Sequence, residues 1–214
     1  MGDRVIRVQG EGEASVPPDQ VALRFDVSHW DRNYGPSIEG LNEHVDLLRQ
    51  DMAGLGIERQ QLKTSSFRVS TTHETVKRGG KEYRQLSGYT ASHSIRLELS
   101  MDRDLLNQVL DAVSRGLAEP SVSIGFEVSD PAPLRQLALE NGVAQARRNA
   151  ETLAAAAGVS LKKIRSIEYG WAEMRIASTH YMLEAPIAAA PASPDLEPRD
   201  VETSESVTVV WEIE

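Results

Sequence analysis

Five histidines and several closely spaced acid pairs are the side chains of this 214-residue chain best suited to chemistry. His93 stands out because it falls in the apolar phase of a segment that alternates as a strand does. A half-buried, hydrogen-bonded core histidine is the common case at such a position, and a ligand or general base is the rarer one. The acid pairs with spacing suited to general acid–base work are Glu11/Glu13, Glu98/Asp102 and Glu212/Glu214. Acids that alternate at the end of a strand usually form a solvated face.

No metal or nucleotide pattern accompanies these residues. The histidines form neither H-x-H nor H-E-x-x-H, and the chain has no cysteine to supply a thiolate ligand, a disulfide or a thiol nucleophile. The stretch VQGEGEASVPPDQVALRFDV, residues 8–27, has two glycines, but Ser15 replaces the third glycine of a dinucleotide fingerprint. We interpret it as a strand with glycine bulges, a proline turn and a return strand after Asp19. We therefore predict no catalytic residues and no metal or cofactor site.

Two tryptophans, Trp30 and Trp171, fall in or near expected loops. Either could stack a ligand, but an aromatic side chain that covers the edge of a core is the more common case.

The net charge of −9 and the pI of about 5.1 argue against a nucleic-acid partner, because such a protein needs clustered Lys and Arg to displace counterions. No stretch approaches the roughly 20 apolar residues of a membrane helix, so we expect no membrane insertion. The opening residues MGDRVIRVQG lack the apolar core of a signal peptide. A cytoplasmic location is therefore expected, with the periplasm as the alternative if this is a mature form.

Alternation of period two predicts the strands of the fold. The clear strand signals lie at residues 21–27, 89–99, 122–128 and 207–213, and weaker ones at 4–13, 62–72 and 163–169. Stripes of period 3.6 predict a helix over 38–55, a second one that begins at the N-cap Asp102 and ends near Gly116, and a third over 133–157. The third helix carries small residues at steps of four, which either form a ridge for close packing or reflect helix propensity alone. These small residues are Ala138, Gly142, Ala146, Ala150, Ala154 and Gly158.

The predicted order is ββαββαβαββ, an α+β protein in which helices cover one face of a mainly antiparallel sheet. Its second to fifth strands give the β-α-β-β-α-β pattern of a ferredoxin-like core. Residues 171–205 interrupt this series of periodic segments. They form a long irregular segment rich in Ala, Pro, Ser and acidic residues. We expect a mobile connector there, with partner contact as the alternative.

Four stretches together resemble the SIMPL-domain family, which includes periplasmic immunogenic and oxidative-stress-defence proteins. They are residues 8–27, LKTSSFRVSTTHE with GYTASHSIRLELS, the alanine-rich LALENGVAQARRNAETLAAAAGVSL, and the closing SVTVVWEI. The resemblance implies a single domain over 1–214 and a non-enzymatic, self-assembling or interaction protein with a role in stress. A small-molecule-binding protein or a hydrolase with an acidic or His93-centred site is the alternative.

Self-association is also expected from the last strand, 206–214. Its first residues carry neither proline nor lysine, the usual devices against pairing of an edge strand, so either another strand of the same chain or a second subunit covers it. The small-residue ridge of the third helix offers a second surface for close approach. We therefore predict a homo-oligomer.

Overall fold

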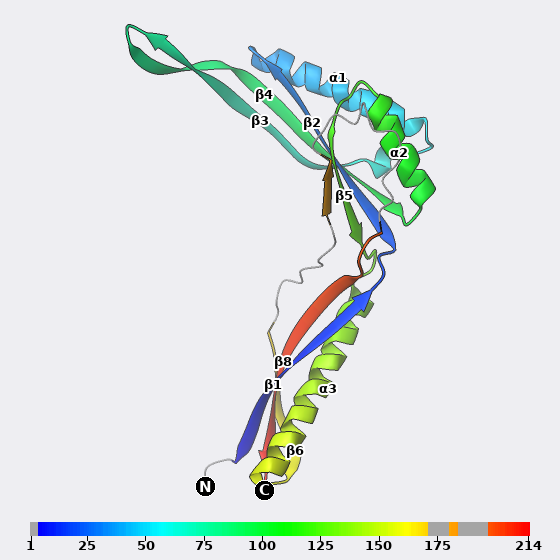
Figure 1. The fold of residues 1–214 in the computed structure, drawn as a ribbon, viewed down its shortest axis with the longest axis vertical. Helices are drawn as coiled ribbons and strands as arrows, with labels where there is room; N and C mark the ends of the chain where they lie inside the picture. Colours follow the sequence, from blue (N-terminus) through cyan, green and yellow to red (C-terminus); the bar gives the residue numbers. More distant parts are fainter. Residues whose placement is uncertain (1–3, 171–179, 184–196) are drawn as a thin grey trace. The chain divides into compact units, whose positions relative to one another are not determined.

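The computed structural model describes residues 4–170, 180–183 and 197–214. The elements, in chain order, are β1 Val5–Val16, β2 Gln20–Asp31, α1 Tyr34–Ala53, a 3-10 turn at Arg59–Gln61, β3 Lys63–Arg78, β4 Lys81–Ser100, α2 Arg103–Arg115, β5 Ser121–Glu127, α3 Ala132–Ala157, β6 Leu161–Tyr169, β7 His180–Leu183 and β8 Val201–Ile213 (Figure 1). They form two compact units. A three-stranded unit contains β1, α3, β6 and β8, and a five-stranded unit contains the other elements.

The five-stranded unit confirms the predicted α+β class and the ferredoxin-like core. Its sheet has the order β3-β4-β2-β5-β7, so the predicted β-α-β-β-α-β pattern is present as β2-α1-β3-β4-α2-β5. Strand β7 extends this sheet beside β5 and was not predicted. The ends of β3 and β4 pair only with each other among the described strands and run on past the neighbouring strand β2, as Figure 1 shows.

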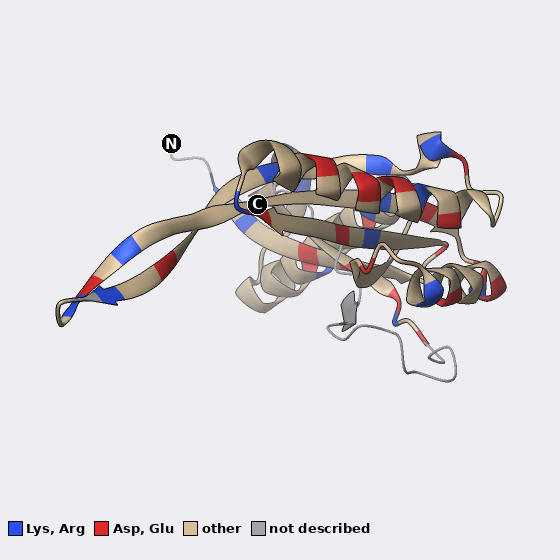
Figure 2. Ribbon diagram, turned by 90° about the horizontal axis from the view of Figure 1, so that it is seen from above, with Lys and Arg blue, Asp and Glu red and all other residues tan. Residues whose placement is uncertain are grey.

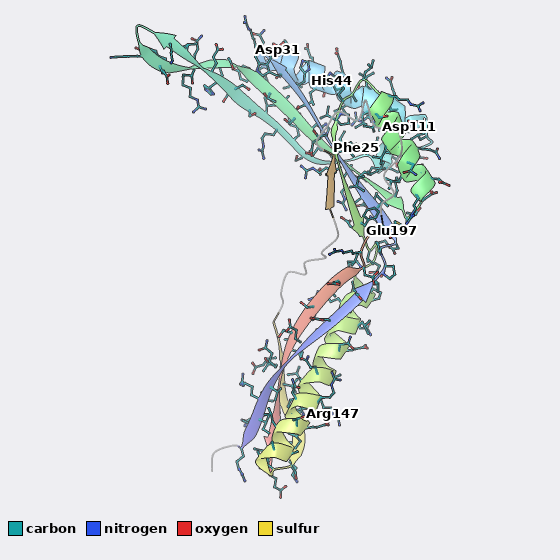
Figure 3. The ribbon with its side chains drawn as sticks, viewed as in Figure 1. Phe25, Asp31, His44, Asp111, Arg147 and Glu197 are labelled. Carbon is teal, nitrogen blue, oxygen red and sulfur yellow. The ribbon has the colours of Figure 1, made fainter. Side chains whose placement is uncertain are left out.

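The core of this unit lies between one face of the sheet and helices α1 and α2. Odd-numbered residues of β2 point into it, and Phe25, fully buried, lies at its centre (Figure 3). Helix α1 contributes the predicted apolar stripe, with Leu41 and Leu48 fully buried. Helix α2 begins where the sequence predicted, because the Asp102 carboxylate accepts hydrogen bonds from the backbone N–H groups of Asp104 and Leu105. The even-numbered residues of β2 and β4, and those of β3 from Ser66 to Thr72, lie on the opposite side of the sheet, which we call the polar face.

The three-stranded unit has the order β1-β8-β6, with α3 packed on β1 and β8. The register from Val5–Glu212 to Val16–Val201 is unbroken, so the expected glycine bulges in β1 are wrong. Nor does β2 return along β1: the two strands on either side of the Pro17-Pro18 link belong to different sheets.

Strand β8 lies in the middle of its sheet, so of the two alternatives for this strand the structure has coverage by strands of the same chain. Both neighbours, β1 and β6, come from the same chain, and Val209 is fully buried. The strand begins at Val201, five residues before the predicted start. Thr203 and Glu205 occupy the buried phase of these first residues, so hydropathy gave no strand signal there. Thus residues 180–183 and 201–205 of the segment expected to be irregular form strands, and residues 171–179 and 184–196 lie outside the described part of the chain.

Candidate functional site

Gly10 and Gly12 serve packing between β1 and α3. A Cβ atom on Gly12 would lie 1.9 Å from the carbonyl oxygen of Ala138 and 2.2 Å from the backbone nitrogen of Gly142. One on Gly10 would lie 2.1 Å from the carbonyl oxygen of Gly142. The strand backbone thus rests directly on the ridge of small residues along α3, whose members from Ala138 to Ala154 are buried. The packing interpretation of the ridge is confirmed, and the ridge is already occupied within the chain.

His93 is the half-buried, hydrogen-bonded core histidine that the sequence favoured. Its Nε2 atom shares a hydrogen bond of 2.9 Å with Thr64 Oγ1, and the ring of Phe67 meets it edge to face. Burial, reinforced by the nearby Arg49 guanidinium, lowers the pKa of the imidazole. His93 lies on the helix-covered side of the sheet, whereas the polar cluster of Ser94 and Asp26 lies on the other side. The structure therefore does not assemble a His93-centred site from these groups.

The acid pairs are also placed for structural roles. Glu98 forms an ion pair with Arg96, with 2.7 Å between Oε1 and Nε, and Asp102 caps the N-terminus of α2. Glu212 and Glu214 face Lys163 and Lys162 across the β6–β8 pairing. The hydrogen bond from the Lys162 ammonium lowers the pKa of the Glu214 carboxyl.

Glu11 and Glu13 line an open, polar cavity of about 290 Å³ on the three-stranded unit, together with Gly12, Asn141, Gln145 and Arg148. Two amide side chains of α3 are already bonded to the strand in this cavity. Gln145 Oε1 accepts from the backbone N–H of Glu11 at 2.6 Å, and Asn141 Nδ2 donates to the carbonyl of Glu13 at 2.8 Å. These bonds satisfy a backbone N–H group and a backbone carbonyl group on the side of β1 that does not pair with β8. At these two positions the edge of β1 is therefore blocked by side chains of α3.

Sequence reasoning missed a cluster on the polar face. Ser94, which is buried, donates to Asp26 and accepts from Ser66 at 3.0 Å and from Arg24 Nη2 at 3.0 Å. Arg24 also donates from Nε to both oxygens of Asp26 at 3.1 Å. The residues come from β2, β3 and β4 and are joined by strand pairing, so no spacing along the sequence could reveal them. The Asp26 carboxylate oxygens accept from Arg24 and Ser94, so they are hydrogen-bonded within the cluster.

A second unpredicted cluster stabilises the three-stranded unit. The Glu205 side chain is only 3% exposed and accepts from Arg135 Nε at 2.8 Å and from the Tyr169 hydroxyl at 3.1 Å. Arg135 also donates to the Tyr169 hydroxyl, and this bond raises the pKa of the guanidinium. The cluster joins α3, β6 and β8. It pairs the buried Glu205 carboxylate, which would destabilise the fold if it were left unpaired.

Trp30 is exposed, at 48%, and lies on the polar face, since it follows the even-numbered phase of β2. Its ring stands over Gly88 of β4: a Cβ atom there would lie 2.9 Å from both Cε2 and Nε1 of the indole. Trp171 lies outside the described residues.

No group of three or more His, Asp or Glu residues in residues 4–170, 180–183 and 197–214 could hold a metal ion. Within the same ranges no helix is long and apolar enough to cross a membrane. Figure 2 shows acidic and basic positions interspersed along the ribbon of the described residues, whereas a nucleic-acid-binding protein needs a clustered basic surface.

A family model described as SIMPL, protein of unknown function (DUF541), matches residues 6–211. Uncharacterized protein YggE of Edwardsiella ictaluri is 26% identical over 160 residues, which cover 74% of this chain and 65% of that protein's length. The chain thus spans slightly less than two thirds of this relative. The 26 kDa periplasmic immunogenic proteins of Brucella melitensis and Brucella abortus are each 27% identical over 215 residues, covering 97% of this chain and 84% of theirs. The family match runs from β1 to β8 and includes both units.

Proposed function

Because this chain belongs to the SIMPL family of proteins of unknown function, we propose a role from its own surfaces: it is a non-enzymatic protein that associates with copies of itself. The observation that carries the proposal is an apolar strip along β6 that the described residues leave exposed, at one edge of the three-stranded sheet. Strand β8 does not support the proposal, since it is central.

The two edges of this sheet differ. At β1, the amide side chains of Gln145 and Asn141 bond the outward N–H of Glu11 and the outward carbonyl of Glu13. A further strand would have to break both bonds before it could pair there. Among the described strands of this unit β6 is the other edge, and it offers a backbone edge for strand addition.

The apolar side chains of β6 lie on the side of the sheet that α3 covers elsewhere. Ile164 pairs with Trp211 and Ile167 with Val209, and these two partners are buried beneath α3. Directly paired residues share a face, so the two isoleucines point to the same side. They are nevertheless 48% and 54% exposed, because α3 packs mainly on β1 and β8.

Helix α3 extends the strip. Arg135 contacts Tyr169 at the end of β6, so the row of α3 residues that begins at Arg135 faces this strand. The next members at steps of four are Leu139 and Val143, and Val143 is 37% exposed. Leu139, Val143, Ile164 and Ile167 are apolar side chains on this side of the unit, and we call them the β6 strip.

A second copy fits this strip because two β6 strands can pair antiparallel across a two-fold axis. Such pairing would join the backbone edges and bring the two strips together. Basic residues on an edge oppose association, and β6 carries Lys162 and Lys163. Here Glu214 and Glu212 of the same chain neutralise them, which weakens this barrier.

The test compares the mass of the wild type with that of Ile167→Lys by light scattering over a range of concentrations. A lysine in the strip buries a charge at the interface, so the variant should shift towards the monomer. Leu117→Lys is the matched control, because Leu117 is an exposed apolar residue, at 74%, in the five-stranded unit. A wild type that stays monomeric at high micromolar concentration, or an Ile167→Lys protein with the wild-type mass, would overturn the proposal.

We also propose that the chain works in the periplasm, the alternative to the cytoplasmic location expected from its first residues. The support is the name of the two Brucella relatives, which are periplasmic immunogenic proteins. Osmotic-shock fractionation of the source cells should release the native protein with periplasmic markers. Retention with cytoplasmic markers would contradict this location.

A further inference from the structure

The polar face of the five-stranded sheet contains an aromatic platform. A Cβ atom at position 88 would lie 2.4 Å from the Asp31 carbonyl oxygen and 2.9 Å from Cε2 and Nε1 of Trp30, so this part of the indole lies close to the backbone of β4. Trp30 is 48% exposed, so much of the residue is open to solvent. Gly88 thus permits a flat, supported aromatic surface.

Hydroxyl groups surround this platform. Thr90 lies directly across from Trp30, and Ser28 pairs with Ser92 one step along the same two strands. Strand β3 adds Ser70, whose Oγ donates to the Thr90 carbonyl at 3.4 Å, and Thr72, whose Oγ1 lies 3.0 Å from Thr90 Oγ1. A hydroxyl can both donate and accept, so the frame suits a partner that does the same.

The polar face carries mixed charges. Arg24 is paired with Asp26 and Arg96 with Glu98, while Arg68 and Lys63 of β3 lie across from Ser92 and Arg96 and add cations to this face. A nucleic acid could stack its bases on an indole, but its phosphates need a clustered basic surface. The chain has a net charge of −9, which opposes a polyanion further.

We propose that Trp30 and the hydroxyl side chains around it bind a saccharide. One face of a pyranose ring carries several C–H groups and can stack on the indole, while its hydroxyls and ring oxygen bond to Ser and Thr side chains. The structure thus supplies both an apolar platform and a polar frame, the two features that sugar recognition requires. The proposal is independent of self-association, because the platform and the β6 strip lie in different units.

Calorimetric titration of the full chain with chitohexaose, and separately with cellohexaose, tests this assignment. Saturable binding of at least one oligosaccharide is expected, and Trp30→Ala should abolish it. Ser92→Ala should weaken binding about fivefold, the effect of losing one hydrogen bond of about 1 kcal/mol. Ser114→Ala is the matched control, because Ser114 lies on α2, on the other side of the sheet, and its removal should leave affinity unchanged.

Thermal melting establishes whether each variant is folded. If Trp30→Ala is unfolded, the affinity of Ser92→Ala compared with that of Ser114→Ala tests the proposal. Absence of binding to both oligosaccharides overturns the proposal, as does wild-type affinity in a folded Trp30→Ala protein. Binding of single-stranded oligo-dT in place of the sugars would also overturn it and assign the platform to nucleobases. None of these outcomes changes the mass expected for Ile167→Lys, so the two proposals can fail separately.

Discussion

Asp51 lies in the last turn of α1, and its Oδ2 atom is buried without a hydrogen-bond partner in the described part of the chain. Gly116 is close by, since a Cβ atom there would lie 2.2 Å from Oδ2. Burial raises the pKa of the Asp51 carboxyl. The negative end of the α1 dipole also disfavours a carboxylate at this position.

We predict that Asp51→Asn stabilises the protein at neutral pH. A carboxyl whose pKa is raised by folding favours the fold most when protonated, below its unfolded pKa of about 3.8. That contribution is lost as pH rises through the folded pKa, so it is smaller at pH 7 than in acid. An asparagine does not ionise, so the gain in unfolding free energy should be present at neutral pH and disappear in acid.

Urea unfolding of both proteins at neutral and acidic pH measures this difference. Glu43→Gln on the exposed side of the same helix is the control and should give no comparable gain. An Asp51→Asn protein no more stable than the wild type at pH 7 would contradict the argument.

At the scale of elements, the contact of β1 with α3 organises the three-stranded unit. Gly12→Ala should destabilise the protein by about 3 kcal/mol, because the new methyl group would overlap backbone atoms of Ala138 and Gly142 that cannot move alone. Gly35→Ala is the matched control. Nothing lies within 4 Å of a Cβ atom there, and alanine favours a helix over glycine by about 1 kcal/mol. Chemical denaturation of the two variants should show opposite signs, and a neutral Gly12→Ala would disprove the close contact.

The ferredoxin-like core could be predicted from the sequence because its strands and helices carry strong local periodicity. Strands such as β2 and β4 bury one face, and helices such as α1 bury one stripe, so hydropathy alone locates them. Strand β8 shows where this fails: Thr203 and Glu205 are buried, and Glu205 is tolerated because Arg135, 70 residues away, neutralises it. A buried polar residue with a distant partner leaves no trace in local hydropathy.

The candidate surfaces could not be predicted for a related reason. The role of Gly10 and Gly12 depends on α3, which lies more than a hundred residues further along the chain. Likewise, the position of Trp30 over Gly88 follows from the pairing of β2 with β4, and the exposure of Ile167 follows from where α3 packs. Sheet order and helix placement arise only when the units fold. Spacing along the sequence can therefore identify a candidate residue such as His93, but it cannot predict these surfaces.

At the scale of the whole molecule, each unit carries a distinct exposed feature. The three-stranded unit has the β6 strip, and the five-stranded unit has the Trp30 platform. The first is suited to a second copy of the chain and the second to a saccharide. A protein organised in this way would present its platforms in several copies on one assembly, which would strengthen binding to a repeating ligand.

Hydrogen–deuterium exchange at increasing protein concentration tests self-association through β6 most directly. Amides of an unpaired edge strand exchange readily, and pairing with a second strand protects them. Exchange in a peptide covering Leu161–Tyr169 should therefore slow as the concentration rises. Exchange at Glu11 in β1, whose backbone N–H donates to Gln145, should not change. Concentration-independent exchange along β6 would contradict the proposed assembly.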